Sequence, residues 1–158
     1  MQGIVVQAST GARIHENLLR ASWVAGIAIQ DLATKTAENL PPPLPQTEVW
    51  GNTVNQSTDP KSSAIDMRGT QSQFINDAVG IATTGLPPIS VHDNMVTGGG
   101  NAVSLASVTE ADIQQNDLDG PGRGLLILAG GWPNRFWKNN VTASEFGVVD
   151  LRQPASGG

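Results

Sequence analysis

The chain has 158 residues, enough for one domain with a substantial core, and only 15% of them are charged. Its net charge of −5 argues against nucleic acid as a partner, and the absence of cysteine excludes disulfides and thiolate metal sites. No apolar run approaches the roughly 18 residues of a membrane span, and the first residues lack the features of a signal peptide, so we expect a soluble protein without a membrane partner.

One short pattern recurs along the chain: two apolar residues separated by one residue, then a turn, then an apolar residue followed by x-x-Asn-x-aliphatic. In chain order, the apolar pairs are Ile4/Val6, Ile27/Ile29, Ile65/Met67, Ile81/Thr83, Val103/Leu105, Leu126/Leu128 and Val149/Leu151. The Asn position is filled by Asn17, Asn52, Asp77, Asn94, Asn116 and Asn139. A spacing as regular as the 13 residues from Val103 to Asn116 identifies a repeat protein.

The alternation of apolar and other residues inside each copy predicts about three short strands per repeat. Repeats of roughly 22–23 residues then predict an all-β fold, a right-handed parallel β-helix of about six to seven coils over residues 3–152. The second copy is longer because of a proline-rich loop insertion at 31–48, and residues 153–158 are expected to be a flexible tail.

The Asn positions are expected to stack at one corner of the coil, because Asn tolerates left-handed backbone angles and its amide both donates and accepts. Such stacking would form a hydrogen-bonded ladder along the axis. Asp77 would be its weakest member, since an ionised carboxylate cannot donate.

Two other interpretations compete with this one. A leucine-rich repeat also contains Asn-x-Leu, but it needs a large aliphatic residue two positions before Ile113 and its equivalents, and only one of the six copies has one. The segment from Asn17 to Leu40 is locally favourable for a helix. We nevertheless predict a strand at Gly26–Gln30, because the repeat predicts it from outside that segment.

The segments IHEN, VHDN, IQQN and FWKN, with GIAI, AIDM, AVSL and VVDL, resemble the coils of the right-handed parallel β-helix proteins related to pectate lyases. The resemblance covers nearly the whole chain but concerns only the fold signature. It implies that the Asn corner lies between the second and third strands, and that a substrate groove follows the outward face of the first strands. It also implies an extracellular or cell-surface location, and calcium only if the chain is a lyase.

The outward residues of the predicted first strands form a column, namely Val5, Ala28, Asp66, Ala82, Ser104, Ile127 and Asp150. Asp66 and Asp150 would lie about 19 Å apart, too far for a pair of carboxylates acting at one site. The weak catalytic candidates are a C-terminal charged group consisting of Asp119, Arg123, Glu145, Asp150 and Arg152. Half a carbohydrate subsite and a surface ion pair between Arg123 and Glu145 are both possible interpretations.

A second outward column is predicted on the strand before each Asn, namely His15, Trp50, Ile75, His92, Gln114 and Trp137. Aromatic side chains in such a column can stack on sugar rings, so Trp50, His92 and Trp137 are the ligand-binding candidates. The two histidines have no carboxylate set with metal spacing around them, so no metal and no cofactor are expected.

A β-helix exposes unpaired backbone groups at both ends, and no capping segment is evident in the sequence. We therefore expect a flanking domain or a homo-oligomeric partner to close the coil ends. The favoured function is a non-catalytic, polysaccharide-recognising scaffold within a longer surface or secreted protein. The alternative is a fragment of a carbohydrate-active enzyme, a polysaccharide lyase or glycoside hydrolase.

Overall fold

The computed structural model describes residues 2–7, 11–22, 25–30, 46–56, 63–68, 89–106, 108, 110–129, 133–142 and 145–152. In this part of the chain the regular structure consists of strands and includes no helix, which confirms the predicted all-β class. The loop residues 31–45 and the predicted tail 153–158 lie outside the described residues. Thr47 and Glu48, predicted to belong to the loop insertion, instead form the start of a strand.

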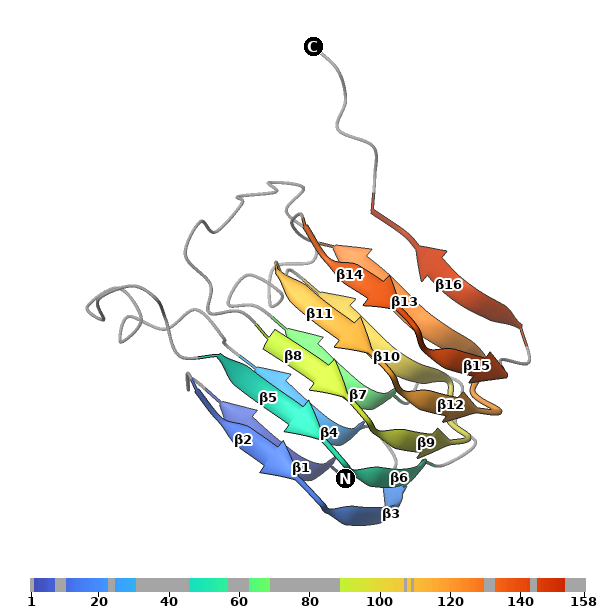
Figure 1. Ribbon diagram of the computed structural model, residues 1–158. Helices are drawn as coiled ribbons and strands as arrows, with labels where there is room; N and C mark the ends of the chain where they lie inside the picture. The colour runs from blue at the N-terminus through green and yellow to red at the C-terminus, as the bar shows by residue number, and fades with distance from the viewer. Residues whose placement is uncertain are drawn as a thin grey trace.

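The strands form three parallel sheets, which the chain visits in the same order on every turn (Figure 1). Sheet A contains β1 (Gln2–Gln7), β4 (Ala25–Gln30), β7 (Ser63–Arg68), β10 (Asn101–Ala106), β13 (Arg123–Ala129) and β16 (Phe146–Asp150). Sheet B contains β2 (Arg13–His15), β5 (Thr47–Trp50), β8 (Ile89–His92), β11 (Ala111–Gln114) and β14 (Arg135–Trp137). Sheet C contains β3 (Leu18–Ser22), β6 (Thr53–Gln56), β9 (Met95–Thr97), β12 (Asp117–Asp119) and β15 (Asn140–Thr142).

Each strand therefore pairs with the equivalent strand of the turn before or after it, which is the arrangement of a parallel β-helix. In the described part of the chain, five turns have all three strands, and β16 opens a sixth turn. The strand predicted at Gly26–Gln30 is confirmed as part of β4, and Leu18–Ser22 also forms a strand. The helical alternative is therefore wrong for these residues, while residues 31–40 of that segment lie outside the described part.

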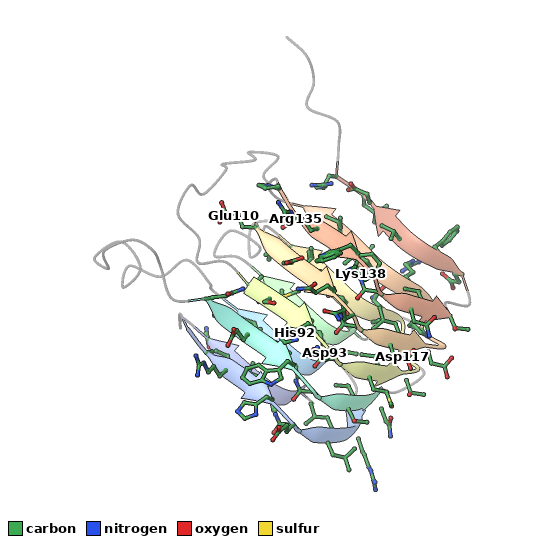
Figure 2. The ribbon with its side chains drawn as sticks, in the orientation of Figure 1. His92, Asp93, Glu110, Asp117, Arg135 and Lys138 are labelled. Atoms are coloured by element: carbon green, nitrogen blue, oxygen red, sulfur yellow. The ribbon has the colours of Figure 1, made fainter. Side chains whose placement is uncertain are left out.

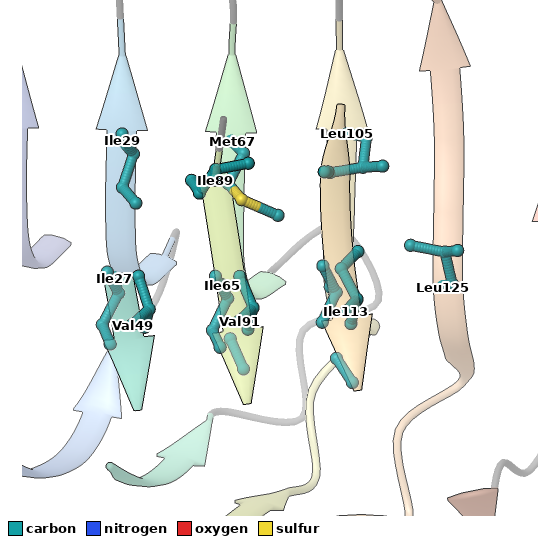
Figure 3. Packing of buried hydrophobic residues seen from close by; sticks show 14 of the residues in the cluster. Ile27, Ile29, Val49, Ile65, Met67, Ile89, Val91, Leu105, Ile113 and Leu125 are labelled. Carbon is teal, nitrogen blue, oxygen red and sulfur yellow. The ribbon is translucent and has the colours of Figure 1, made fainter. Parts of the chain in front are cut away.

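Inward side chains from the three sheets fill the coil (Figure 3). Sheet A contributes pairs such as Ile27 and Ile29, while Val49 of sheet B and Val54 of sheet C close the same turn, and all four are fully buried. Equivalent residues of successive turns stack on one another, which suits the β-branched and aliphatic side chains that strands favour. Burying each of these side chains contributes about 1.5–3 kcal/mol.

Two coils that the sequence predicted to be separate form one coil in the structure. The coil containing Ile65 and Met67 and the coil containing Val91 and Asn94 were predicted to be separate. In the structure β5 pairs directly with β8, and β7 lies between β4 and β10, so no further strand fits between them. Residues 69–88, between β7 and β8, therefore connect two strands of one turn. Phe74, Asp77, Ile81 and Ala82 lie in this segment, outside the described residues.

The predicted register is wrong by one residue from β13 onward. Val103 is level with Leu125, and Ser104 is level with Leu126, so the inward pair is Leu125/Ile127 rather than Leu126/Leu128. A one-residue shift moves every side chain of a strand to the other face. Gly124 explains the register, because a Cβ atom there would lie only 2.5 Å from the Gly147 carbonyl oxygen. A larger residue cannot occupy this position.

The asparagine ladder is confirmed over Asn17, Asn52, Asn94, Asn116 and Asn139. Each side-chain nitrogen donates to the side-chain oxygen of the next Asn, as from Asn52 to Asn94 at 2.9 Å. That oxygen also accepts the backbone N–H of the preceding Asn. Because Asn52 bonds directly to Asn94, the ladder has no place for Asp77 between them.

The left-handed position of this corner is the residue before each Asn, rather than the Asn itself as predicted. Backbone φ values between 53° and 60° occur at Glu16, Gly51, Asp93, Gln115 and Lys138. The Asn side chain then points into the corner and bonds to the carbonyl oxygen two residues earlier, as Asn116 does to Gln114 at 2.8 Å. These bonds hold the adjacent residues of sheet B in a fixed orientation.

Candidate functional site

The outward face of sheet B carries two parallel rows of side chains. The row nearer the strand starts contains Arg13, Glu48, Ser90, Asp112 and Arg135. The row nearer the Asn corner contains His15, Trp50, His92, Gln114 and Trp137, as predicted except for Ile75, which lies outside the described residues. Both rows repeat at the spacing of the turns, about 4.8 Å.

At the N-terminal end of this face, Trp50 lies between two histidines. The ring centroids of His15 and Trp50 are 4.3 Å apart with 9° between the planes, and those of Trp50 and His92 are 6.2 Å apart with 7° between the planes. His15 and His92 belong to the turns on either side of Trp50, so an imidazole ring faces each side of the indole. With both rings beside it, Trp50 remains partly exposed.

At the C-terminal end, Trp137 has a different environment. Its indole N–H donates to the Asp112 carboxylate at 2.7 Å, and the Lys138 ammonium lies 4.5 Å from the ring centroid. With both contacts in place, 41% of Trp137 remains exposed. Gln114 is its neighbour in the row, and Arg135 lies two residues earlier on the same strand. A fixed indole is therefore surrounded by hydrogen-bonding and charged groups.

The corner next to this face carries charges of both signs (Figure 2). The His92 ring nitrogen lies 2.7 Å from the Asp93 carboxylate, and His15 lies 3.8 Å from Glu16. Across the corner on sheet C, Asn140 donates to Asp117 at 2.9 Å. Acidic groups therefore predominate along most of the corner, and Lys138 places a cation beside Trp137.

The predicted C-terminal charged group separates into pairs. Arg123 and Glu145 form an ion pair at 3.5 Å, and Arg152 binds Asp150 through Nε at 2.9 Å. Arg123 is level with Phe146 and Ile127 is level with Asp150, so the two pairs are four residues apart along the strands, about 13 Å. Asp119 lies on sheet C with its side chain exposed. The five residues do not converge on one site.

The Asp150 carboxylate is hydrogen-bonded to Arg152. The side-chain hydrogen bond from Arg152 holds the pKa of Asp150 below its ordinary value of 3.8, and the same bond raises the pKa of Arg152. A carboxylate with a lowered pKa is a poor proton acceptor at neutral pH. Asp150 is also level with the inward residue Ile127, so its predicted place in the outward column of sheet A is wrong.

The outward column of sheet A includes Val5, Ala28, Ser104, Leu126 and Val149. The backbone of Asp66 is level with Ala28 and Ser104, but its side chain lies outside the described part of the structure. The central members of the column are covered, with exposures of 0% for Ala28, 3% for Ser104 and 7% for Leu126. A polymer groove along the first strands, as the resemblance implies, would need these residues to be open to solvent. In the structure they are not.

Sequence reasoning identified Trp137 but missed the side chains that define its surroundings, Asp112, Arg135 and Lys138. Asp112 could have been found by counting back along each strand, because it stands two positions before Gln114 and therefore points to the same face. Its bond to a tryptophan one turn away depends on side-chain conformation, which the pattern does not carry. Among the described residues, no three His, Asp or Glu side chains are placed to hold a metal ion.

None of the described residues belongs to a helix that is long and apolar enough to cross a membrane. Comparison of the chain with protein-family models, with curated proteins and with solved structures gives no match.

Proposed function

We propose that this chain is a non-catalytic β-helix module that recognises polysaccharide through the outward face of sheet B, centred on Trp137. The observation that carries the proposal is an indole that is fixed by Asp112 and still 41% exposed. Sugar rings offer apolar C–H faces to aromatic rings and hydroxyl groups to polar neighbours, and recognition sites combine both kinds of contact. Gln114, Asp112 and Arg135 supply the polar contacts.

In this proposal, the three predicted ligand-binding residues have different roles. Trp137 is the stacking residue, because the rings of His15 and His92 occupy the sides of Trp50. Trp50 and His92 contribute ring edges and hydrogen-bonding nitrogens along the same row. Equivalent positions recur on each turn, so an extended polymer lying parallel to the axis would meet them in succession.

The pectate-lyase-like superfamily is the family that the coil pattern resembles, and the proposal takes from it the class of ligand and the extracellular or surface setting. A catalytic role as a lyase or hydrolase receives less support. The outward face of sheet A is covered, and the C-terminal charged residues form two separate ion pairs. Incubation with pectate, alginate or glycosaminoglycans, with or without calcium, should produce no unsaturated uronate, as followed by ultraviolet absorbance.

Binding is tested by affinity electrophoresis in gels that contain neutral or acidic polysaccharides. The wild-type chain should be retarded by at least one of them, and Trp137→Ala should reduce the affinity by about tenfold or more, since an aromatic contact of this kind is worth about 1–2 kcal/mol. Phe146→Ala is the matched control, because Phe146 is an exposed aromatic residue on sheet A. Retardation that Trp137→Ala leaves unchanged, or no retardation by any polysaccharide, would exclude this site.

A further inference from the structure

The first and last complete turns end in surfaces that match each other. In sheets B and C the first turn presents His15, Glu16 and Asn17, and the last turn presents Trp137, Lys138 and Asn139 at the equivalent positions. If the first turn of one copy lay on the last turn of another, these positions would be one turn spacing apart. Glu16 would then meet Lys138, and His15 would meet Trp137 as it already meets Trp50.

The asparagine ladder would continue across this contact. Inside the chain every side-chain nitrogen from Asn17 to Asn116 donates to the next Asn oxygen. Asn139 donates to the carbonyl oxygens of Ile113 and Trp137, and within the described residues it has no further Asn as a partner. Asn17 of a second copy would supply that acceptor. The inward apolar residues at the two ends, such as Leu19 and Val141, are also only partly buried.

In sheet A, β1 of the second copy would pair with β13, but β16 already occupies that edge of β13. The sequence of β16 is FGVVD, and the first five residues of β1 are QGIVV. The register in which β16 pairs with β13 is the same as the register in which β1 pairs with β4. Gly147 is equivalent to Gly3, Val148 to Ile4 and Val149 to Val5. The strand β16 therefore lies where β1 of a following copy would lie.

The two strands differ in charge at one inward position. Asp150 is level with Ile127, where β1 would place Val6. An inward-pointing charge is one of the features by which proteins protect a sheet edge from further pairing. Arg152 binds this carboxylate and neutralises it.

We propose that the end formed by β13, β14 and β15 is a docking surface for β1, β2 and β3 of a second copy of this chain, and that β16 blocks it by occupying the edge of β13. Head-to-tail contact of this kind is heterologous and leads to open filaments. One like-charge pair opposes it, because Arg13 would meet Arg135, although Arg13 is already paired with Glu48 at 3.4 Å. The attached strand β16 has a high effective concentration, so the wild-type chain should associate only weakly.

Releasing β16 tests the proposal. The double variant Phe146→Pro/Leu151→Pro removes the backbone hydrogen bonds from residue 146 to Gly122 and from residue 151 to Ile127. In sedimentation velocity over a range of concentrations, this variant should form a series of oligomers at concentrations about 100-fold lower than the wild type. Adding Lys138→Glu should return it to monomers, and adding Glu16→Lys as well should restore the oligomers.

A cross-linking experiment in the otherwise wild-type chain covers the case in which the proline variant does not fold. The chain has no cysteine, so Arg20→Cys and Thr142→Cys chains can be mixed and oxidised. These positions lie in one row of sheet C and would be neighbours across the contact. Leu18→Cys with Thr142→Cys is the control, because the two-residue offset exceeds disulfide reach.

A disulfide-linked heterodimer of the first pair only, together with oligomers that follow the charge exchange, supports the proposal. A folded proline variant that stays monomeric, or oligomers that ignore the charge exchange, would overturn it. So would a failure of the Arg20→Cys and Thr142→Cys chains to form a heterodimer at the highest protein concentration reached, where even the weak association of the wild-type chain is trapped by oxidation.

Discussion

The outward faces of sheets A and B differ although their strands follow the same alternation. On sheet A the central outward residues Ala28, Ser104 and Leu126 are covered, and two of the three are small. On sheet B the outward residues other than Ser90, which is buried, are long, polar or aromatic, and Trp137 remains exposed. The repeat pattern determines which residues point outward. Whether the face that they form is covered or exposed differs between the two sheets, as do the size and polarity of the outward side chains. A binding site is therefore sought on sheet B.

Placing a charge on each face should give the largest difference. Ala28→Glu buries a carboxylate at a position with 0% exposure and should cost about 4 kcal/mol in the free energy of unfolding. Gln114→Glu adds the same group to the open face and should cost less than about 0.5 kcal/mol. Urea denaturation followed by circular dichroism measures both values. Similar costs for the two variants would show that the faces do not differ in this way.

The asparagine ladder allows a similar comparison between a buried and an exposed polar side chain. Asn116→Ala removes a buried amide that accepts from Asn94 and donates to the carbonyl oxygens of Val91 and Gln114, and it should cost about 2–3 kcal/mol. Asn139→Ala, at the end of the ladder, should cost about 1 kcal/mol. The exposed Asn140→Ala serves as the control. If all three variants unfold at the same denaturant concentration as the wild type, the ladder does not stabilise the fold.

A buried polar group without a partner should show the opposite sign. The Thr47 hydroxyl is fully buried and makes no hydrogen bond to any residue that the structure describes. Thr47→Val keeps the branched shape and removes this cost, so the chain should become more stable by up to about 1 kcal/mol. Thermal unfolding measures the change, with Thr53→Val on the half-exposed part of sheet C as the control. A loss of stability in Thr47→Val would mean that the hydroxyl has a role in the fold.

The smallest effect is expected at the exposed pair of Asp150 and Arg152. Because the folded-state pKa of Asp150 is lowered, its contribution to stability is present above the ordinary value of 3.8 and is lost as the pH falls through the folded value. Asp150→Asn should therefore be slightly less stable than the wild type at pH 7, and the difference should vanish in stronger acid. A difference that grows as the pH falls would contradict the assignment.

Much of the fold could be predicted from the sequence because inward residues recur at fixed intervals. The coil, the strands before and after each Asn, and the row containing His15, Trp50, His92 and Trp137 follow from this periodicity. It did not predict the register of β13, since the segment GLLILA is apolar on both faces. Gly124 could have indicated the correct register. A small residue, Gly26, Ala64 or Ala102, directly precedes the inward pair in three other strands of sheet A, and Gly124 precedes Leu125/Ile127 in the same way.

The sequence pattern also failed to show that β7 and β8 belong to one turn, for a similar reason. Phe74, Asp77 and Ile81 imitate the repeat pattern closely enough to suggest a coil, and only the direct pairing of β5 with β8 excludes it. The candidate site was predicted as a row of aromatic residues. Its detailed chemistry, with Asp112 holding Trp137 and with histidines stacked on Trp50, depends on side-chain positions that periodicity does not specify.

The most direct test of the difference between the two faces uses single cysteines. The chain has none, so Ser104→Cys and Gln114→Cys each introduce one thiol, on the outward faces of sheets A and B respectively. Reaction with a maleimide should be at least about tenfold slower at position 104 than at position 114, because the covered thiol reacts only after local opening. Equal rates would show that sheet A is open, and they would restore its outward face as a candidate substrate groove.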